Sequence, residues 1–255
     1  MTIMARRNLI TGLAGIPLAA VLANPQLAAL AAAGLATVSL KTASGREVSA
    51  ALALPATTPA PAVLLIHEWW GLNDQIKTMG AELAKEGLVA LAVDLYDGKV
   101  ASDPASAESY MNAVDADQAT ETLTAWIEWL KADGRTTGKI GTVGWCFGGG
   151  WSLNASIAAP IDATVIYYGW VERPAADLAA LKGPVLGQFA ETDKWINHEM
   201  VAGFETEMAA AGKPLEVHWY SAGHGFANPT GSNHDKEDAL AAWARTLAFF
   251  RANLA

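Results

Sequence analysis

Short apolar runs that favour β-strands alternate along this chain with longer stretches that favour helices, and this alternation constrains the fold more than any other feature. Strands are predicted at 62–67, 88–94, 139–144, 163–168, 185–190 and 215–220. Helices are predicted at 75–86, 105–132, 149–158, 175–181, 198–211 and 235–253. Several strand runs are apolar at nearly every position, as strands covered on both faces are. The pattern predicts an α/β fold with a doubly wound, mostly parallel sheet and helices on both faces.

The region before the first of these strands has a different pattern. Two runs at 36–42 and 48–54 flank a Ser44-Gly45 turn, which predicts an antiparallel hairpin at the edge of the sheet. No repeat, charge block or long linker interrupts residues 34–255, so we expect them to form a single domain. Apolar residues make up 52% of the chain and charged residues 17%, a composition that excludes intrinsic disorder.

The predicted strand at 139–144 runs directly into Gly144-Trp-Cys-Phe-Gly-Gly-Gly150 and then into a predicted helix. This is the G-x-nucleophile-x-G pattern of a nucleophile elbow, with Cys146 in the place of serine. A helix N-terminus behind the thiol supplies N–H groups and a positive dipole end, which favour a thiolate and an oxyanion. The alternative is a small, inert, buried thiol at a strand–helix turn. The occurrence of strand, glycines and helix together favours a catalytic Cys146.

A nucleophile elbow predicts an acid and then a histidine further along the chain. The predicted strand at 185–190 ends in Glu191-Thr-Asp193, and the strand at 215–220 is followed by Gly223-His224-Gly225. His224 is the predicted general base, and Asp193 is the predicted acid that orients it. Glu191 is the rival acid. Structural or surface roles are predicted for the remaining histidines, which are His67, His198, His218 and His234.

Several spaced motifs, together and in this order, resemble the dienelactone hydrolase family of the α/β-hydrolase superfamily over nearly all of residues 37–253. They are Asp94-Leu-Tyr, Gly144-Trp-Cys-Phe-Gly-Gly, Glu191-Thr-Asp193, His218-Trp-Tyr and Gly223-His-Gly-Phe. The resemblance implies an α/β-hydrolase fold, hydrolysis of esters or lactones of the carboxymethylenebutenolidase type through an acyl-enzyme, and no cofactor or metal. It implies a Cys146–His224–Asp193 triad, in agreement with the interpretation from the residues themselves.

The resemblance also implies roles for the loop after the strand at 62–67. The family's glutamate that hydrogen-bonds the resting thiol and helps to activate it falls on Glu68, and the backbone N–H groups of Trp69 and Phe147 would form the oxyanion hole. Without the resemblance, Glu68 is only a carboxylate at the carboxyl end of a strand, where α/β sheets place ligands. A surface salt bridge is the alternative role for that carboxylate.

The chain departs from the family at the two arginines that grip a substrate carboxylate, because their positions hold Gly98 and Asn228. Lys99 lies beside the first position, although a lysine is not a bidentate clamp. This difference favours a substrate more neutral and apolar than a dienelactone. Aromatic side chains in or beside the predicted loops are candidates for such a pocket, with core packing as the alternative for about half of them: Trp69, Trp70, Trp145, Trp195 and Phe226.

The N-terminus has the architecture of an export signal. Arg6-Arg7 precede an apolar stretch without charge up to Lys41, and Ala31-Ala32-Ala33 offers small residues for a signal peptidase. Residues 1–33 are therefore predicted to be a cleaved, twin-arginine-like signal that directs the protein to the periplasm or the outside of the cell. A retained membrane anchor and a cytosolic helix are the alternatives, and Pro17 and Pro25 disfavour the anchor.

The charge balance and the single cysteine limit the possible partners. A net charge of −9 disfavours binding to nucleic acid or to anionic membrane surfaces. One cysteine excludes an internal disulfide and a cysteine-rich metal site. We expect a monomer that acts on a small ester or lactone and has no stable membrane anchor once the signal is removed. An exported binding protein without turnover and a thiol redox sensor are the rival functions, although a sensor usually needs a resolving thiol.

Overall fold

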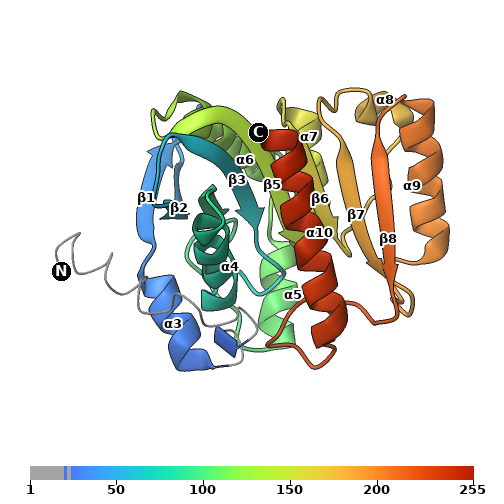
Figure 1. The fold of residues 1–255 in the computed structure, drawn as a ribbon, viewed down its shortest axis with the longest axis horizontal. Helices are drawn as coiled ribbons and strands as arrows, with labels where there is room; N and C mark the ends of the chain where they lie inside the picture. The colour runs from blue at the N-terminus through green and yellow to red at the C-terminus, as the bar shows by residue number, and fades with distance from the viewer. Residues whose placement is uncertain (1–19, 22–23) are drawn as a thin grey trace.

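The computed structural model describes residues 20–21 and 24–255. Eight strands form one sheet in the order β1-β2-β4-β3-β5-β6-β7-β8 (Figure 1). The strands are β1 (Ala36–Lys41), β2 (Glu47–Ala53), β3 (Ala60–Ile66), β4 (Val89–Val93), β5 (Thr136–Trp145), β6 (Ala163–Tyr167), β7 (Val185–Ala190) and β8 (Leu215–Tyr220). All pairs from β4 to β8 are parallel, and β2 pairs antiparallel with both β1 and β4. The predicted parallel sheet and the predicted edge hairpin are thus confirmed.

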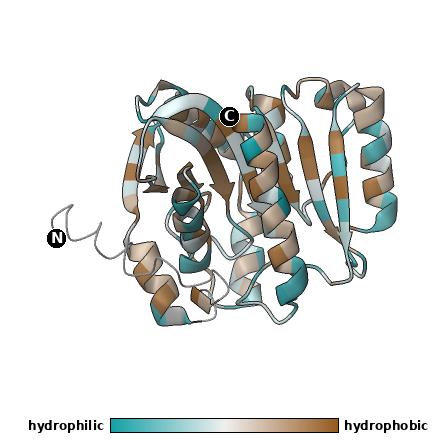
Figure 2. Cartoon of the chain, viewed as in Figure 1, coloured by the Kyte–Doolittle hydropathy of each residue, from teal (hydrophilic) through white to brown (hydrophobic). Residues whose placement is uncertain are grey.

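Helices cover both faces of this sheet. The described helices are α3 (Pro25–Ala33), α4 (Asp74–Lys85), α5 (Pro104–Asn112), α6 (Ala116–Ala132), α7 (Phe147–Ala158), α8 (Ala175–Leu178), α9 (His198–Ala210) and α10 (Lys236–Leu254). In Figure 1, α4 and α10 lie in front of the sheet, and α6 and α7 lie behind it. The strands β3, β4, β6 and β7 are buried along almost their whole length, and the visible part of β3 is largely brown in Figure 2.

The alternation of side chains along β3 divides the core between the two faces. Val63 and Leu65 pack with the residues of α4 and α10, whereas Leu64 and Ile66 pack against α6, where Trp126 is fully buried. A further core on the α6 and α7 side lies under α9. Since successive residues of a strand point to opposite faces, one apolar strand serves two helix layers.

The prediction of one continuous helix over 105–132 is wrong. The segment forms two helices, because α5 ends at Asn112 and the Asp115 side chain accepts a hydrogen bond from the Gln118 N–H, 2.9 Å away, at the start of α6. Aspartate favours the N-cap position, where its carboxylate satisfies a free N–H group. A new helix start is therefore encoded where the helical periodicity alone predicts continuation.

Most of the predicted export signal, at 1–19 and 22–23, lies outside the described residues. Its last part forms α3, whose Ala28, Ala31 and Ala32 are buried. The Thr78 hydroxyl of α4 donates to the Ala28 carbonyl over 3.2 Å. Among the described residues, no helix combines the length and the apolarity needed to cross a membrane.

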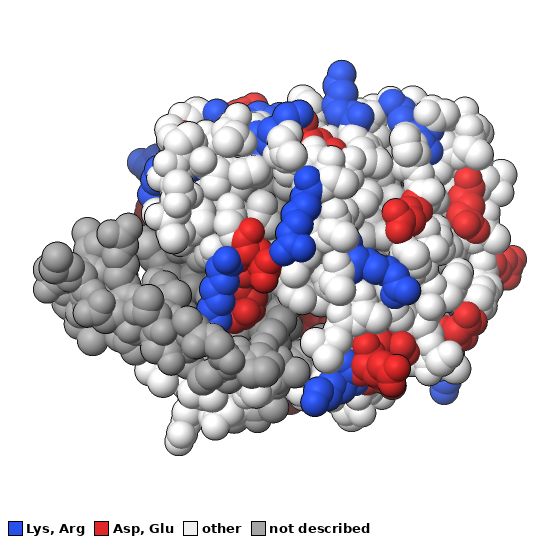
Figure 3. Space-filling view, viewed as in Figure 1, with Lys and Arg blue, Asp and Glu red and all other residues white. Residues whose placement is uncertain are grey.

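Charged side chains of both signs are interspersed on the described part of the face shown in Figure 3. Ion pairs such as Arg251–Glu86 and Lys85–Glu82 join opposite charges at the surface. Binding to nucleic acid needs a continuous basic area. The visible, described part of this face does not present one.

Candidate active site

The turn between β5 and α7 holds Cys146 in a backbone conformation that is rare for a residue with a side chain, at φ 54° and ψ −118°. Glycines on both sides make this turn possible. A Cβ on Gly144 would lie 1.9 Å from the carbonyl oxygen of Gly148, and a Cβ on Gly148 would lie 2.2 Å from the carbonyl oxygen of Ile66. The Gly-x-Cys-x-Gly spacing is thus a steric requirement of the sharp turn, which presents the thiol at the carboxyl edge of the sheet.

Two other loops at the same edge bring an acid and a histidine to the thiol. The Asp193 loop follows β7 and the His224 loop follows β8. The Asp193 Oδ2 atom lies 2.6 Å from His224 Nδ1, so the imidazole donates its Nδ1–H to the carboxylate. The other ring nitrogen remains for the Cys146 sulfur. Cys146 and His224 line one cavity and interact through their side chains, so the structure brings Cys146, His224 and Asp193 together.

The charges around His224 favour its protonated form. Burial alone would lower the pKa of His224, but the Asp193 carboxylate and the Cys146 sulfur raise it to about 10. Burial alone would raise the pKa of Asp193, but the hydrogen bond and charge of His224, with two backbone N–H groups, hold it below its usual value. Those N–H groups belong to Trp195 and Ile196 and lie 2.9 and 3.1 Å from Asp193 Oδ1.

Two backbone N–H groups beside the thiol have no acceptor among the residues that the structure describes. They belong to Trp69, in the loop after β3, and to Phe147, the first residue of α7. The first N–H groups of a helix are free of intrahelical partners and lie at the positive end of its dipole. This pair can donate to an oxygen that becomes negative during attack on a carbonyl.

Glu68 is a buried carboxyl group, 4% exposed, and forms no ion pair with a described residue, so the surface salt bridge considered as its alternative role is not observed. The Tyr168 hydroxyl donates to Oε1 over 3.3 Å, and the Asn228 amide donates to Oε2. Burial raises the pKa of Glu68 from 4.5 to about 7, although Asn228, His224 and Tyr168 each oppose the shift. A carboxyl group with this pKa can gain or lose a proton at neutral pH.

Tyr168 is a site residue that the sequence reasoning missed. It follows β6 directly, is fully buried, and has a positive φ of 35°. Its ring centroid lies 5.1 Å from that of His224, and its hydroxyl contacts Glu68. The only available signal was its position at the carboxyl end of a predicted strand, where α/β sheets place their sites.

A cavity of about 710 Å³ opens above these groups. Cys146, His224, Glu68 and Asn228 line it. Five tryptophans form much of its wall: Trp69, Trp70, Trp151, Trp170 and Trp195. Trp195 is 64% exposed, so the cavity mouth presents an aromatic surface to solvent. An aromatic cavity with a few convergent polar groups is suited to a small organic ligand.

Three predicted pocket residues do not line this cavity. The Trp145 side chain is 2% exposed and packs on Tyr167 at a centroid separation of 5.5 Å, because it points into the core on the α4 and α10 side. Phe226 is fully buried between Tyr168 and Tyr220. These two aromatics are therefore core residues.

Lys99 also lies apart from the nucleophile. It lines a smaller cavity of about 190 Å³, and its ammonium lies over the Tyr110 ring, 5.6 Å from the centroid. The Asp94 side chain holds this loop in place, since its carboxylate accepts from the N–H groups of Tyr96 and Gly98. Lys99 is thus not positioned to replace the family's arginines.

The remaining acid and histidine candidates have other partners. Glu191 pairs with His198 at the surface, 2.7 Å apart, whereas Asp193 is the acid that contacts His224. His67 is fully buried, accepts the Leu95 N–H at Nε2 and donates from Nδ1 to the Glu68 carbonyl, 2.6 Å away. It ties the loop after β3 to the loop after β4, which is a structural role. His218 contacts the Glu216 carboxylate, and His234 contacts the backbone carbonyl of Phe226.

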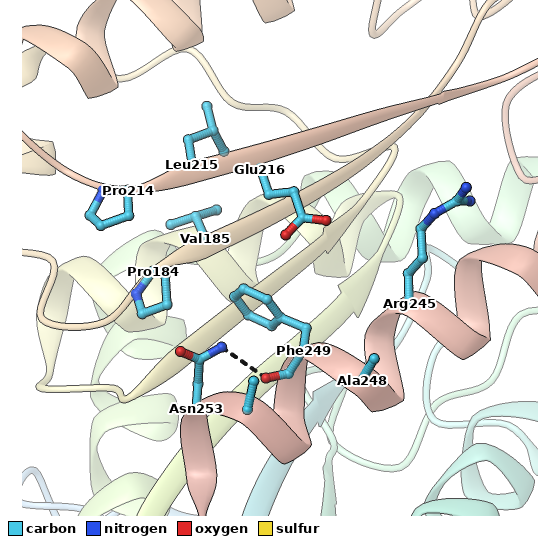
Figure 4. Close-up of a pocket in the computed structure, with 10 residues that line it drawn as sticks. Pro184, Val185, Pro214, Leu215, Glu216, Arg245, Ala248, Phe249 and Asn253 are labelled. Carbon is cyan, nitrogen blue, oxygen red and sulfur yellow. Dashed lines mark hydrogen bonds between the residues drawn. The ribbon is translucent and has the colours of Figure 1, made fainter.

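A second large cavity, of about 480 Å³, lies at the amino ends of the strands, opposite the carboxyl ends that hold Cys146 (Figure 4). Pro184 and Pro214, at the amino ends of β7 and β8, line one side, and Phe249 and Asn253 of α10 line the other. Ligands of open α/β sheets bind at the carboxyl ends of the strands. The cavity that contains Cys146 is therefore the candidate active site.

The chain is similar to known proteins in both sequence and fold. The profile of the dienelactone hydrolase family matches residues 48–254. Protein usf of Aquifex pyrophilus is 34% identical over 207 residues, covering 75% of this chain and 87% of that protein. Carboxymethylenebutenolidase 1 of Cupriavidus pinatubonensis is 27% identical over 220 residues, covering 82% and 94%. A solved dienelactone hydrolase-like promiscuous phosphotriesterase from metagenomic libraries has a TM-score of 0.78 at 23% identity, covering 87% and 99%.

Proposed function

From the premise that this chain belongs to the dienelactone hydrolase family of hydrolases, we propose that it cleaves esters or lactones with Cys146 as the nucleophile. The observation that carries the proposal is the strained turn that presents Cys146 next to His224, whose other nitrogen contacts Asp193 over 2.6 Å. A binding protein would need neither the strained thiol nor the oriented histidine.

The reaction proceeds by acyl transfer through a thioester. The Cys146 thiolate attacks the carbonyl carbon, and the N–H groups of Trp69 and Phe147 stabilise the oxyanion. The imidazolium of His224 gives its proton to the departing alkoxide or enolate oxygen as the C–O bond breaks. His224 then takes a proton from water, the hydroxide attacks the thioester, and the carboxylic acid leaves as the thiolate re-forms.

Glu68 regulates the charge of the resting site in this proposal. Its carboxyl group is buried beside the triad, and its pKa of about 7 allows both protonation states near neutral pH. The ionised form accepts the thiol proton when Cys146 becomes a thiolate. Tyr168 and Asn228 hold the carboxyl group in place through hydrogen bonds to its two oxygens.

In the proposed substrate, the part next to the scissile carbonyl is neutral and apolar. The two positions at which the family carries arginines hold Gly98 and Asn228, and the Asn228 amide is bonded to Glu68. Trp69 and Trp70, which follow Glu68 in the same loop, also line the cavity and make its wall aromatic there. A neutral ester or enol lactone fits these surroundings better than a compact dienelactone carboxylate.

The test is hydrolysis of p-nitrophenyl acetate, p-nitrophenyl butyrate, a neutral enol lactone and an anionic dienelactone by wild type and Cys146→Ala. We expect the neutral substrates to be preferred and turnover to fall at least a thousandfold in the variant. A mass increase on wild type equal to the acyl group, absent from the variant, would identify the thioester. Activity that persists in Cys146→Ala would refute the assigned nucleophile.

We also propose that the first 33 residues direct export, on the strength of Arg6-Arg7, the uncharged stretch that follows and Ala31–Ala33. The position of cleavage matters for the fold, because α3 covers part of α4. Cell fractionation followed by N-terminal sequencing of the exported protein tests both points. A cytosolic protein that retains residue 1 would contradict the proposal.

A further inference from the structure

One cation lines the active-site cavity away from the triad. Arg173 lies in the loop between β6 and α8, and its guanidinium is fixed against α7. The Asn154 Oδ1 atom accepts from Nε at 3.0 Å and from Nη2 at 2.7 Å, and the Glu172 carbonyl accepts from Nη1 at 2.5 Å. Arg173 forms no ion pair with any carboxylate of the residues that the structure describes.

The surroundings of Arg173 favour a negative ligand. Burial lowers the pKa of Arg173, although the charges of Asp177 and Glu172 oppose that shift, and a guanidinium stays protonated at any physiological pH. Partial burial of a cation that is not directly paired with a carboxylate costs free energy, and the charges of Asp177 and Glu172 offset that cost only in part. An anion that enters the cavity would offset this cost, whereas the neutral Asn154 amide only positions the side chain.

The guanidinium retains donors for such an anion. Arginine has five N–H groups, and three of them are used by Asn154 and Glu172. The remaining N–H groups, one on Nη1 and one on Nη2, match the two oxygens of a carboxylate. The fixed side chain has also already lost much of its rotamer freedom, so binding requires less ordering.

The distance between Arg173 and the nucleophile follows from α7. Phe147, Gly150, Trp151 and Asn154 all line the cavity, which is the spacing of one helix face. Asn154, the residue that holds Arg173, is eight residues after Cys146, about 12 Å along a helix axis. The cavity wall between the two ends is aromatic or lacks a side chain, with Trp151 and Gly150. A ligand that spans it has an apolar middle.

We propose that Arg173 binds a carboxylate at the far end of the substrate, so that the enzyme prefers esters or lactones whose acyl chain is apolar near the carbonyl and anionic at its other end. The inference rests on the proposed hydrolytic function and extends it. It differs from the family's arrangement, because the cation is about two helical turns from the nucleophile rather than beside it. A compact anionic lactone does not reach Arg173 while its carbonyl is at Cys146.

Two esters of equal chain length test this proposal. p-Nitrophenyl hydrogen suberate carries a distal carboxylate, and p-nitrophenyl octanoate has the same number of acyl carbons without charge. We expect Arg173→Gln to lower the suberate-to-octanoate ratio of kcat/KM by about tenfold to a hundredfold, since a charge-assisted hydrogen-bonded pair is lost. Arg173→Lys keeps the charge and should retain part of the preference. An unchanged ratio in Arg173→Gln, or an equal loss with both esters, would overturn the proposal.

A matched variant separates the local effect from the loss of a positive charge. Arg251→Gln removes an arginine at the surface, where its partner is Glu86, and should leave the ratio unchanged. If Arg251→Gln lowers the ratio as much as Arg173→Gln, the preference reflects overall charge and the proposal fails.

A binding measurement distinguishes failure of this inference from failure of the hydrolytic function. Suberic acid monoanilide is not a substrate for rapid cleavage, and its binding can be followed by calorimetry with wild type and Arg173→Gln. Tighter binding to wild type, at least tenfold, supports the inference even if no ester is turned over. Cys146-dependent turnover with equal anilide affinities in the two proteins supports the hydrolase and refutes the role of Arg173.

Discussion

The loops after β3 and β7 each place one buried carboxyl group at the active site, and the two groups behave in opposite ways. The pKa of Glu68 is raised to about 7, and that of Asp193 is held below its usual value. Both are largely removed from solvent, with exposures of 4% and 7%. Burial raises the pKa of both groups, and the two differ in how far their partners oppose it. Asp193 has a directly bonded histidine and two backbone N–H donors, which outweigh burial, whereas the amide and the hydroxyl bonded to Glu68 do not.

This difference separates the two roles. A carboxylate that stays ionised keeps His224 in one tautomer and stabilises its positive charge. A carboxyl group with a pKa near neutrality can exchange a proton during the reaction. Substitutions can make the Glu68 and Asp193 carboxyl groups more or less alike in pKa. The expected effects on activity and stability differ in size.

The largest effect is expected for Asp193→Asn. The amide cannot stabilise the imidazolium, so the pKa of His224 falls from about 10 and the rate falls by roughly 10³ to 10⁴. Steady-state kcat/KM with p-nitrophenyl butyrate and NMR titration of the histidine measure both quantities. Glu191→Gln is the matched control, because Glu191 pairs with His198 at the surface. An equal loss of kcat/KM in Glu191→Gln would contradict the assignment of Asp193 as the acid that orients His224.

The next effect concerns the free energy of unfolding. The folded pKa of Glu68, about 7, exceeds its ordinary value of 4.5, so the folded state binds the proton more tightly. Protonation of Glu68 therefore adds about 3 kcal/mol to the free energy of unfolding below pH 4.5. This contribution is lost as the pH rises through 7. Glu68→Gln has no such titration. Its stability relative to wild type should therefore increase by about 3 kcal/mol between pH 4.5 and pH 8, measured by urea unfolding at both pH values.

Asp193 gives the opposite sign and serves as the internal comparison. Its folded pKa is depressed, so its contribution to stability is present above the unfolded pKa and is lost as the pH falls through the folded value. Asp193→Asn should therefore lose stability relative to wild type at neutral pH and lose less in acid. Parallel pH dependences for the Glu68 and Asp193 variants would contradict the opposite shifts.

The third prediction concerns the rate at which Glu68→Gln turns over substrate. Glutamine keeps a hydrogen-bonding side chain of similar shape but cannot accept the thiol proton, so kcat/KM should fall by roughly a hundredfold. In wild type, activity should rise with pH through about 7 as Glu68 ionises. That ionisation should be missing from the profile of the variant. A wild-type profile that persists unchanged in Glu68→Gln would assign the ionisation to another group.

Much of the fold, and the convergence of Cys146, Asp193 and His224 on one site, could be predicted from the sequence because those features depend on local rules. The Gly144-x-Cys146-x-Gly148 spacing reflects contacts within one turn, and the acid and the histidine each follow a recognisable strand. Strand composition predicted burial on two faces. These signals are short in range, so no knowledge of distant contacts was needed.

The remaining site residues depend on contacts between distant segments. Arg173 lines the cavity because Asn154, 19 residues earlier on α7, holds its guanidinium. Tyr168 reaches Glu68 across 100 residues. Conversely, Trp145 is adjacent to the nucleophile but points into the core, because neighbouring residues of a strand face opposite sides. Proximity in sequence therefore favoured the wrong aromatic at Trp145. Position in a loop after a strand was the better guide, since the predicted Trp69, Trp70 and Trp195 line the cavity.

The smallest effect is expected at Asn228, the residue that stands where the family has an arginine. Its amide opposes the rise in the pKa of Glu68, and Asn228→Ala removes that hydrogen bond. The pKa should then rise above 7, which lowers activity at pH 7 severalfold and leaves it unchanged at high pH. Asn228→Arg should have the opposite effect, because a cation beside Glu68 lowers its pKa and makes this carboxyl group resemble Asp193. The pH profiles of kcat/KM for both variants test the comparison, and shifts in the same direction would contradict it.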